Sequence, residues 1–435
     1  MIKVRELNKI SADELARLMR RGEQDITALL PTAEEIIAHV RREGDEALAF
    51  YNRKFNAPDF TREMLRASEG DFAAAREALS PDVRAAIRQA HENIRKFHAE
   101  QMPEPMWFME VMPGVLAGEK ITPVASAALY VPRGKGAFPS VMLMLAAPAV
   151  VAGVERLVVV TPPGPDGKVD AASLYAAEVA GVKEVYAVGG MHAIAALAYG
   201  TETVPKVAKV VGPGSSYTSA AKRLLYGVMD VGVPAGPSES IILADEAADP
   251  RLAALDLLVE AEHGPDSAAL LVTHSRALAN EALCLLPDLI ARLPEWRQKF
   301  VQTVLGDYGG ILITGSLDES IRFVNDYAPE HLEILTQDPF TTLGRIRNAG
   351  EILLGPYTPI PISNYCLGLN ATLPTGGFAR SFSSVSVFDF LKRSGIGYLS
   401  PEGYAALRET TVCLADYEGF PAHALSIRQR DEWWR

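Results

Sequence analysis

The chain has 435 residues, of which 48% are hydrophobic and 22% charged, a balance typical of a soluble globular protein with room for two or three domains. Its formal net charge is −12, and the sequence contains no basic run that could neutralise phosphates. The composition therefore argues against nucleic acid as the main partner.

Neither a signal peptide nor a membrane span is expected. The first residues, Met1 to Lys9, are charged and lack the apolar core of a signal peptide. The most apolar stretch, Val141–Val160, is interrupted by proline, glycine and charged residues, which favours a buried helix followed by a strand. Cys284, Cys366 and Cys413 are too widely spaced for a disulfide framework or a cysteine zinc site. We therefore expect a cytoplasmic protein.

The first 110 residues or so are predicted to be mainly helical. Two capping boxes, Ser11 to Glu14 and Thr32 to Glu35, place a carboxylate three residues after the cap. The histidines of this part lie among charged residues in helical context, and we interpret them as belonging to solvated faces: His39, His91 and His98. Nothing in this segment indicates chemistry.

From Ala125 the pattern changes to alternating strands and helices. A short strand over 125–131 runs into a glycine-bearing loop at 132–139, which is followed by an apolar helix at Val141–Ala152 and a strand at Arg156–Val160. This order is a βαβ unit, which implies a right-handed crossover and a parallel sheet.

Two further units of this kind follow. The strand Glu184–Val188 ends in Gly189-Gly190, and the strand Val207–Val211 ends in the loop Gly212–Ser216. Ligands of such sheets bind beyond the carboxyl ends of the strands, where glycine allows a close backbone approach. The loops favour a nucleotide, although none of them is a GxGxxG motif or a P-loop.

The next helix, Arg251–His263, begins after Asp249-Pro250 and carries Glu260 and His263 in its last turn. The i, i+3 spacing places both side chains on one face, where they can offer two metal ligands at once. Alternatively, His263 only compensates the dipole at the helix C-terminus.

The stretch Tyr327–Glu333 is the strongest candidate for chemistry. Pro329 is expected to push Ala328 towards an extended conformation, which gives a turn followed at once by Glu330 and His331. An imidazole beside a carboxylate suits a reaction that loses protons and recruits water. The alternative is that Pro-Glu-His only opens a helix.

A set of motifs along nearly the whole chain resembles the histidinol dehydrogenase family. They occur in the order and spacing of the family: Tyr130-Val-Pro, Gly189-Gly190, Gly212-Pro-Gly, Ala235-Gly-Pro-Ser-Glu239, Ala261-Glu-His263-Gly-Pro-Asp, Tyr327-Ala-Pro-Glu-His-Leu, Leu373-Pro-Thr375, Ser383-Ser384 and Glu418 followed by His423. The Pro-Glu-His-Leu and Gly-Pro-Ser-Glu motifs are the most specific of these.

The resemblance implies an α/β fold of two doubly wound, partly Rossmann-like domains with small helical extensions at both termini. The implied division is an N-terminal helical arm at 1–27, a first α/β domain with the catalytic and metal residues at 28–129 plus 237–385, an NAD-binding second α/β domain at 130–236, and a small C-terminal domain at 386–435 that reaches the site of the partner subunit.

The family implies a homodimer that oxidises a primary alcohol through a bound aldehyde to a carboxylate, with two molecules of NAD as acceptors. Carried over, His331 is the general base that takes the alcohol proton, and Glu330 activates the water that attacks the aldehyde. One zinc ion per subunit holds the substrate. The protein then has to supply only proton transfer, positioning and charge stabilisation.

The zinc ligands of the family are Gln, His, Asp and His, and the corresponding residues here are Glu260, His263, Asn364 and His423. One carboxylate is kept, so we predict a working zinc site. The implied substrate contacts are Ser238, Glu260, His263, His331, Asn364, Glu418 and His423, with Glu418 offered by the partner subunit. The implied NAD contacts are Tyr130, His192 and Ser215, of which the last two differ from the family pattern.

Other departures leave the substrate open. Ala371 replaces a family histidine, and Arg133 adds a cation to a loop near the site. Together they favour an anionic substrate such as 2,3-dihydroxypropane-1-sulfonate over L-histidinol. Two further hypotheses are an aldehyde dehydrogenase that uses Cys366 as its nucleophile, and a non-catalytic relative that only binds metal or nucleotide.

Overall fold

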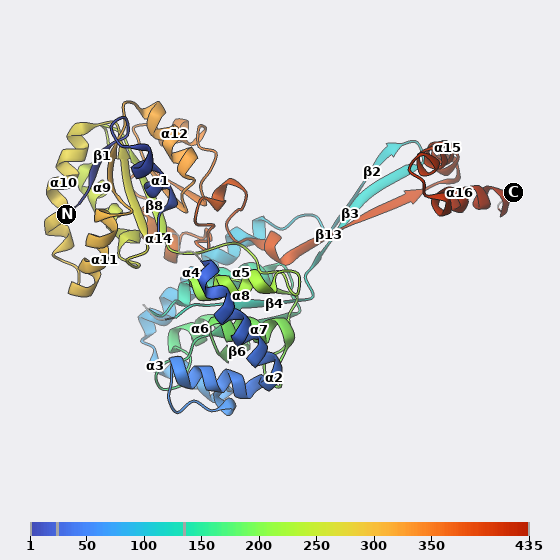
Figure 1. The fold of residues 1–435 in the computed structure, drawn as a ribbon, viewed down its shortest axis with the longest axis horizontal. Helices are drawn as coiled ribbons and strands as arrows, with labels where there is room; N and C mark the ends of the chain where they lie inside the picture. Colours follow the sequence, from blue (N-terminus) through green and yellow to red (C-terminus); the bar gives the residue numbers. More distant parts are fainter. Residues whose placement is uncertain (1, 23–25, 134–135, 434–435) are drawn as a thin grey trace. The chain divides into compact units, whose positions relative to one another are not determined.

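The computed structural model describes residues 2–22, 26–133 and 136–433 (Figure 1). The chain splits into two compact units. The large unit comprises Met1–Gln101 and Val124–Phe390, and the small unit comprises Met102–Pro123 and Leu391–Arg435. Among the residues described, no helix has both the length and the apolar character needed to cross a membrane.

A six-stranded parallel sheet forms one half of the large unit, with the order β1-β10-β9-β8-β11-β12. Its strands are β1 (Val4–Glu6), β8 (Glu239–Ala244), β9 (Ala268–Thr273), β10 (Gly310–Ile313), β11 (His331–Leu335) and β12 (Glu351–Leu354). The central strands are continuous apolar runs because both faces of the sheet are covered by helices.

The two faces of this sheet pack against different helices. Ile242 and its neighbours pack against α9 (Pro250–Ala261), α10 (Arg276–Ile290) and α11 (Glu295–Gly306). On the other face, Ile241 and its neighbours pack against α1 (Ala12–Arg20) and α12 (Leu317–Tyr327). Side chains alternate along a strand, so His331 points to the same face as Leu335, which packs in the cluster with α9.

The second sheet of the large unit is parallel and has the order β6-β5-β4-β7. It contains β4 (Ser126–Tyr130), β5 (Arg156–Thr161), β6 (Glu184–Ala187) and β7 (Lys209–Val211), which confirms the predicted βαβ order. Its helices are α5 (Pro139–Val151), α6 (Ala171–Val179), α7 (Gly190–Tyr199) and α8 (Ser216–Leu225). The chain leaves β4 to one side and returns to its other side at β7, which creates a switch point between these two strands.

Three helices between residues 30 and 100 pack against the helices of this second sheet. They are α2 (Leu30–Phe55), α3 (Glu69–Ala78) and α4 (Pro81–Glu100). α2 contacts α7 and α8, α3 contacts α6, and α4 contacts α5. The grouping of 28–129 with 237–385 in one domain stays a prediction.

The small unit contains the antiparallel sheet β13-β3-β2 and two helices. Its elements are β2 (Met106–Met112), β3 (Val115–Pro123), β13 (Leu391–Leu399), α15 (Pro401–Tyr417) and α16 (Pro421–Trp433). The sequence does not indicate the strands β2 and β13, because neither alternates cleanly between apolar and polar residues. The shorter helices α13 (Pro339–Leu343) and α14 (Ile360–Tyr365) belong to the large unit.

Candidate active site

The turn that carries Glu330 joins the end of α12 to the start of β11. Ala328 ends α12 with φ 53° and ψ 66°, in the left-handed region, and its N–H donates to the carbonyl of Val324. The prediction of an extended Ala328 is therefore wrong, and so is the alternative that this segment opens a helix. A left-handed residue costs alanine about 1–2 kcal/mol, which neighbouring contacts must offset.

His331 is oriented by a buried carboxylate on the neighbouring strand. Its Nδ1 lies 2.6 Å from Oε1 of Glu351, which is its register partner on β12. Oε2 of Glu351 accepts a hydrogen bond of 2.5 Å from the Ser363 hydroxyl on α14. With Nδ1–H donating to Glu351, Nε2 is the ring nitrogen left to accept a proton.

Two more carboxylates face His331 Nε2, Oε1 of Glu260 and Oε1 of Glu330, each at 3.9 Å. Burial lowers the pKa of His331, but the three carboxylates outweigh it and raise this pKa to about 10. Glu330 is itself buried, and desolvation raises the pKa of its carboxyl well above the usual range. The backbone N–H of Glu239 donates to Glu330 Oε2 at 2.7 Å and fixes its position.

The predicted metal ligands of the large unit lie together at the end of α9 and on α14. Glu260 Oε2 lies 3.2 Å from His263 Nδ1, and Glu260 Oε1 accepts a hydrogen bond of 3.2 Å from Asn364 Nδ2. Asn364 Oδ1 is buried and has no hydrogen-bond partner among the described residues. An orphaned oxygen beside an imidazole and a carboxylate fits a divalent cation such as zinc. Such a cation would also offset the excess negative charge around His331.

His423 and Glu418 belong to the small unit. Glu418 caps the end of α15, and His423 lies in the first turn of α16 with its ring 5.2 Å from that of Phe420. Both side chains are exposed. Within the described residues no three His, Cys, Asp or Glu side chains form a metal-binding cluster.

The three predicted NAD contacts differ in their surroundings. Ser215 caps α8 just after β7, and its exposed side chain makes no capping bond. Tyr130 ends β4, and its buried hydroxyl accepts a hydrogen bond of 3.0 Å from the N–H of Gly190. These two residues flank the switch point between β4 and β7. Gly134 and Lys135 of the first predicted loop lie outside the described residues.

The third predicted NAD contact, His192, occupies a buried position on α7. Its side chain is buried under α2, with Nε2 3.3 Å from Asn52 Oδ1 and the ring 5.3 Å from that of Tyr51. Burial lowers the pKa of its imidazole to about 3. His98 is also buried, against Gln101 and Asn370, so its assignment to a solvated face was wrong.

Several residues of the site carry no signal in the sequence. Glu351 and Ser363, which orient His331, stand in segments without a recognisable motif. Only the parallel pairing of β11 with β12 brings Glu351 to His331. Arg133 donates to the carbonyl of Lys168 at 2.9 Å, and Cys366 is exposed after α14.

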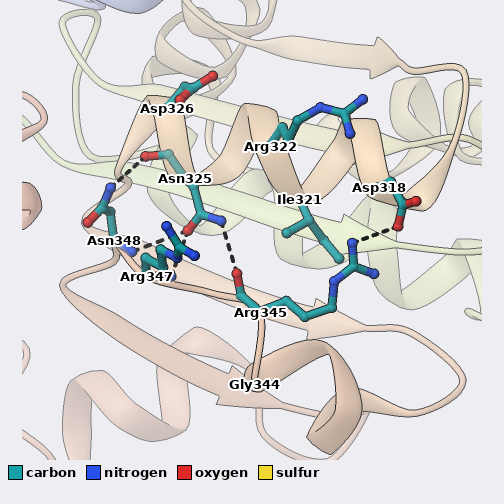
Figure 2. A pocket seen from close by; sticks show the side chains of 9 residues that line it. All are labelled: Asp318, Ile321, Arg322, Asn325, Asp326, Gly344, Arg345, Arg347 and Asn348. Atoms are coloured by element: carbon teal, nitrogen blue, oxygen red, sulfur yellow. Dashed lines mark hydrogen bonds and ion pairs between the residues drawn. The ribbon is translucent and has the colours of Figure 1, made fainter.

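A separate polar pocket lies on the α12 side of the sheet, between α12 and residues 344–348 (Figure 2). Its volume is about 630 Å³. Asn325 Nδ2 donates to the carbonyl of Arg345 at 3.0 Å, and its Oδ1 accepts the N–H of Arg347 at 2.6 Å. These contacts fix the last turn of α12, which leads directly into the turn that holds Glu330.

Comparison with known proteins gives a consistent result. A family model described as histidinol dehydrogenase matches residues 19–431. The histidinol dehydrogenase of Synechocystis sp. is 58% identical over 431 residues, 99% of each chain. A histidinol dehydrogenase homolog of Cereibacter sphaeroides is 55% identical, covering 97% of this chain and 96% of that one. The crystal structure of histidinol dehydrogenase from Elizabethkingia anophelis matches with a TM-score of 0.94 at 31% identity, covering 100% of this chain and 98% of that chain. This structural match confirms the predicted α/β fold class.

Proposed function

Because this chain belongs to the histidinol dehydrogenase family, we propose that it oxidises L-histidinol through a bound aldehyde to L-histidine, using NAD and one zinc ion per subunit. The observation that carries this proposal is the arrangement around His331. Glu351 orients the imidazole, and Glu330 stands 3.9 Å from its Nε2. His331, the proposed acceptor of the alcohol proton, thus lies next to Glu330, the carboxylate proposed to activate a water molecule.

The two residues have separate duties in the proposed reaction. With the field of the neighbouring carboxylates offset by a bound cation, His331 Nε2 would take the proton of the substrate hydroxyl, while NAD accepts the hydride when bound. Glu330 then takes a proton from the water that attacks the aldehyde, and a second hydride transfer leaves the carboxylate. The raised pKa of Glu330 brings its carboxyl towards the range in which a base works efficiently near neutral pH.

We propose that zinc is held by Glu260, His263 and Asn364, together with His423 of the partner subunit. The metal would hold the substrate and polarise its hydroxyl. The support from this chain is the buried, unpaired Asn364 Oδ1 beside Glu260 and His263. For NAD we propose the switch point between β4 and β7, with the free Ser215 hydroxyl at the start of α8 and Tyr130 holding the Gly190 loop.

A homodimer is supported by the surface of the small unit. Every residue of β2 is exposed, although six of its seven residues are apolar: Met106, Trp107, Phe108, Met109, Val111 and Met112. An edge strand of this composition needs a cover. We propose that a second copy of the chain provides it and that the small unit brings Glu418 and His423 to the partner's site.

The charge of the site favours a cationic substrate. Three carboxylates lie within 4 Å of His331, and their combined field raises the pKa of its imidazole to about 10. The ammonium group of L-histidinol is attracted by this field, whereas a sulfonate is repelled. Arg133, which suggested an anionic substrate, is engaged by the carbonyl of Lys168. 2,3-Dihydroxypropane-1-sulfonate is therefore the second candidate.

Steady-state reduction of NAD by the zinc-loaded protein tests the proposal. We expect turnover with L-histidinol and much slower turnover with 2,3-dihydroxypropane-1-sulfonate, and loss of both in His331→Asn. Faster turnover with 2,3-dihydroxypropane-1-sulfonate would make that compound the substrate. Absence of turnover with either compound would refute the proposal. The three free, exposed cysteines suit a reducing compartment, so we place the reaction in the cytoplasm.

A further inference from the structure

We propose that Arg21, at the end of α1, is a positioning residue that holds the turn from Tyr327 to Glu330 in its working geometry. The inference rests on the role proposed for Glu330. It assigns a part in the reaction to the N-terminal helix, far from the catalytic motifs in the sequence.

The first observation is that two strained residues meet. Among the described residues only Arg21 and Ala328 combine a side chain with positive φ, at 60° and 53°. Each costs energy that its surroundings must offset, and such residues concentrate at functional sites. The guanidinium of Arg21 donates to the carbonyl oxygens of Tyr327 and Ala328, the latter at 3.4 Å. The side chain of the strained Arg21 thus binds the backbone of the strained Ala328.

The second observation is the burial of this guanidinium. Arg21 is 6% exposed, and its Cζ lies 3.8 Å from the centre of the Tyr327 ring. Its Nη1 pairs with both oxygens of the buried Glu239, at 3.2 and 3.1 Å. A buried ion pair is retained at a considerable desolvation cost and adds little net stability. The buried pair of Arg21 and Glu239 therefore points to a requirement that the groups bound to it keep their positions.

Glu239 continues the contact to the catalytic carboxylate. Its Oε1 accepts the N–H of Gly376 at 2.7 Å, and its own N–H donates to Glu330 Oε2 at 2.7 Å. Arg21 therefore reaches Glu330 by two routes, through the backbone of the turn and through Glu239. His331 is oriented independently by Glu351. Loss of Arg21 should therefore harm water activation more than the removal of the alcohol proton.

Gly22 shows that this corner is packed closely against a second loop of the site. A Cβ on Gly22 would lie 1.9 Å from the carbonyl oxygen of Asp266, which follows His263 by three residues. The backbone after Arg21 therefore touches the loop that follows the proposed metal ligand. The end of α1 contacts both loops on which the chemistry depends.

The test compares four variants of the zinc-loaded full chain. Arg21→Met leaves Glu239 buried without its cation, so it is expected to lose stability as well as activity. The double variant Arg21→Met with Glu239→Gln removes the whole ion pair and is expected to recover much of that stability. The matched control is Arg5→Met, because Arg5 is equally buried and binds Glu14 and two carbonyls away from the turn. Glu330→Gln gives the reference for loss of water activation.

Oxidation of the alcohol and of the aldehyde, supplied separately with NAD, is measured for each variant. We expect the double variant to lose about 10- to 100-fold in kcat for the aldehyde, with a smaller loss for the alcohol and little change in KM. Arg5→Met should lower the stability without this selective loss. Recovery of aldehyde oxidation together with stability in the double variant would overturn the inference, and so would an equal loss in Arg5→Met.

Hydrogen exchange of the peptide 325–332 provides a readout that does not need turnover. We expect faster exchange in the double variant than in the parent or in Arg5→Met. If Glu330→Gln oxidises the aldehyde as well as the parent, the role proposed for Glu330 fails. The exchange rates then still decide whether Arg21 holds the turn, and unchanged exchange would refute it.

Discussion

The pair Asp256 and Glu333 leads to a sharp prediction about stability and pH. Glu333 is fully buried on β11, on the face of His331, and in the described part of the chain neither of its oxygens has a hydrogen-bond partner apart from the Asp256 carboxyl. Burial, and then the neighbouring Asp256 carboxyl on α9, raise the pKa of Glu333 far above its ordinary value of 4.5. Glu333 is therefore protonated at neutral pH, and its neutral carboxyl interacts with the carboxyl of Asp256.

The sign of the pH dependence follows from this proton. At a pH above the range in which an exposed glutamate titrates, the unfolded chain releases the Glu333 proton, while the native protein keeps it. The stabilisation is fully present below about pH 4.5 and is lost as the pH rises towards the raised pKa in the native state. When the native protein binds one proton more than the unfolded chain, the free energy of unfolding falls by about 1.4 kcal/mol per pH unit. Between pH 5.5 and 8.5 this loss is therefore at most about 4 kcal/mol. Because Asp256 is half-buried and partly screened, we expect roughly 2 kcal/mol.

The substitution Glu333→Gln removes this titration while an amide N–H can still donate to Asp256. The difference in free energy of unfolding between the variant and the parent should shift by about 2 kcal/mol in favour of the variant when the pH is raised from 5.5 to 8.5. Guanidinium denaturation followed by tryptophan fluorescence measures this difference, at one protein concentration because the stability of the proposed dimer would depend on it. Asp256→Asn is the control and should flatten the curve only partly, since burial of Glu333 persists. Parallel curves for parent and Glu333→Gln would show that Glu333 is ionised in the native protein.

Three further predictions concern turnover. Glu351→Gln should lower kcat about 10- to 100-fold with little change in KM, because His331 loses its charged partner; a rise in KM alone would refute this. Cys366→Ser should keep activity within about twofold of the parent, because a hydride-transfer mechanism through His331 needs no thiol nucleophile; an inactive variant would favour the thiohemiacetal mechanism. Removal of metal by a chelator should abolish NAD reduction, and added Zn²⁺ should restore it; lower thermal stability with unchanged turnover would assign the metal a structural role.

The local parts of the site were predictable from sequence. Glu330 and His331 are adjacent in the chain, so a single motif places them together. Glu260 and His263 share a face because of helical spacing, and Asn364 does lie beside Glu260. The parallel strands from residue 126 onward were recognisable because buried strands are short apolar runs between glycine-bearing loops.

The remaining parts depend on contacts between distant segments. Arg21 meets Tyr327 across 306 residues, and no local pattern distinguishes it from the other arginines of an amphipathic helix. The left-handed Ala328 contradicts the local preference before proline, since tertiary contacts outweigh a cost of about 1–2 kcal/mol. His192 was placed by its position in a motif, but the packing of α2 over α7 buries it.

The location of the acidic cluster has a physical cause in the sheet itself. Glu239, His331 and Glu351 are the first residues of β8, β11 and β12, so the cluster lies at the amino ends of the strands, whereas ligands of parallel sheets usually bind at the carboxyl ends. At this edge the N–H of Glu351, the first residue of β12, donates to the carbonyl of Glu330 at 2.9 Å. The N–H of Glu239, the first residue of β8, donates to the carboxylate of Glu330 at 2.7 Å. Two strand amides therefore hold Glu330, one at its carbonyl and one at its carboxylate, and the turn after α12 delivers Glu330 to them.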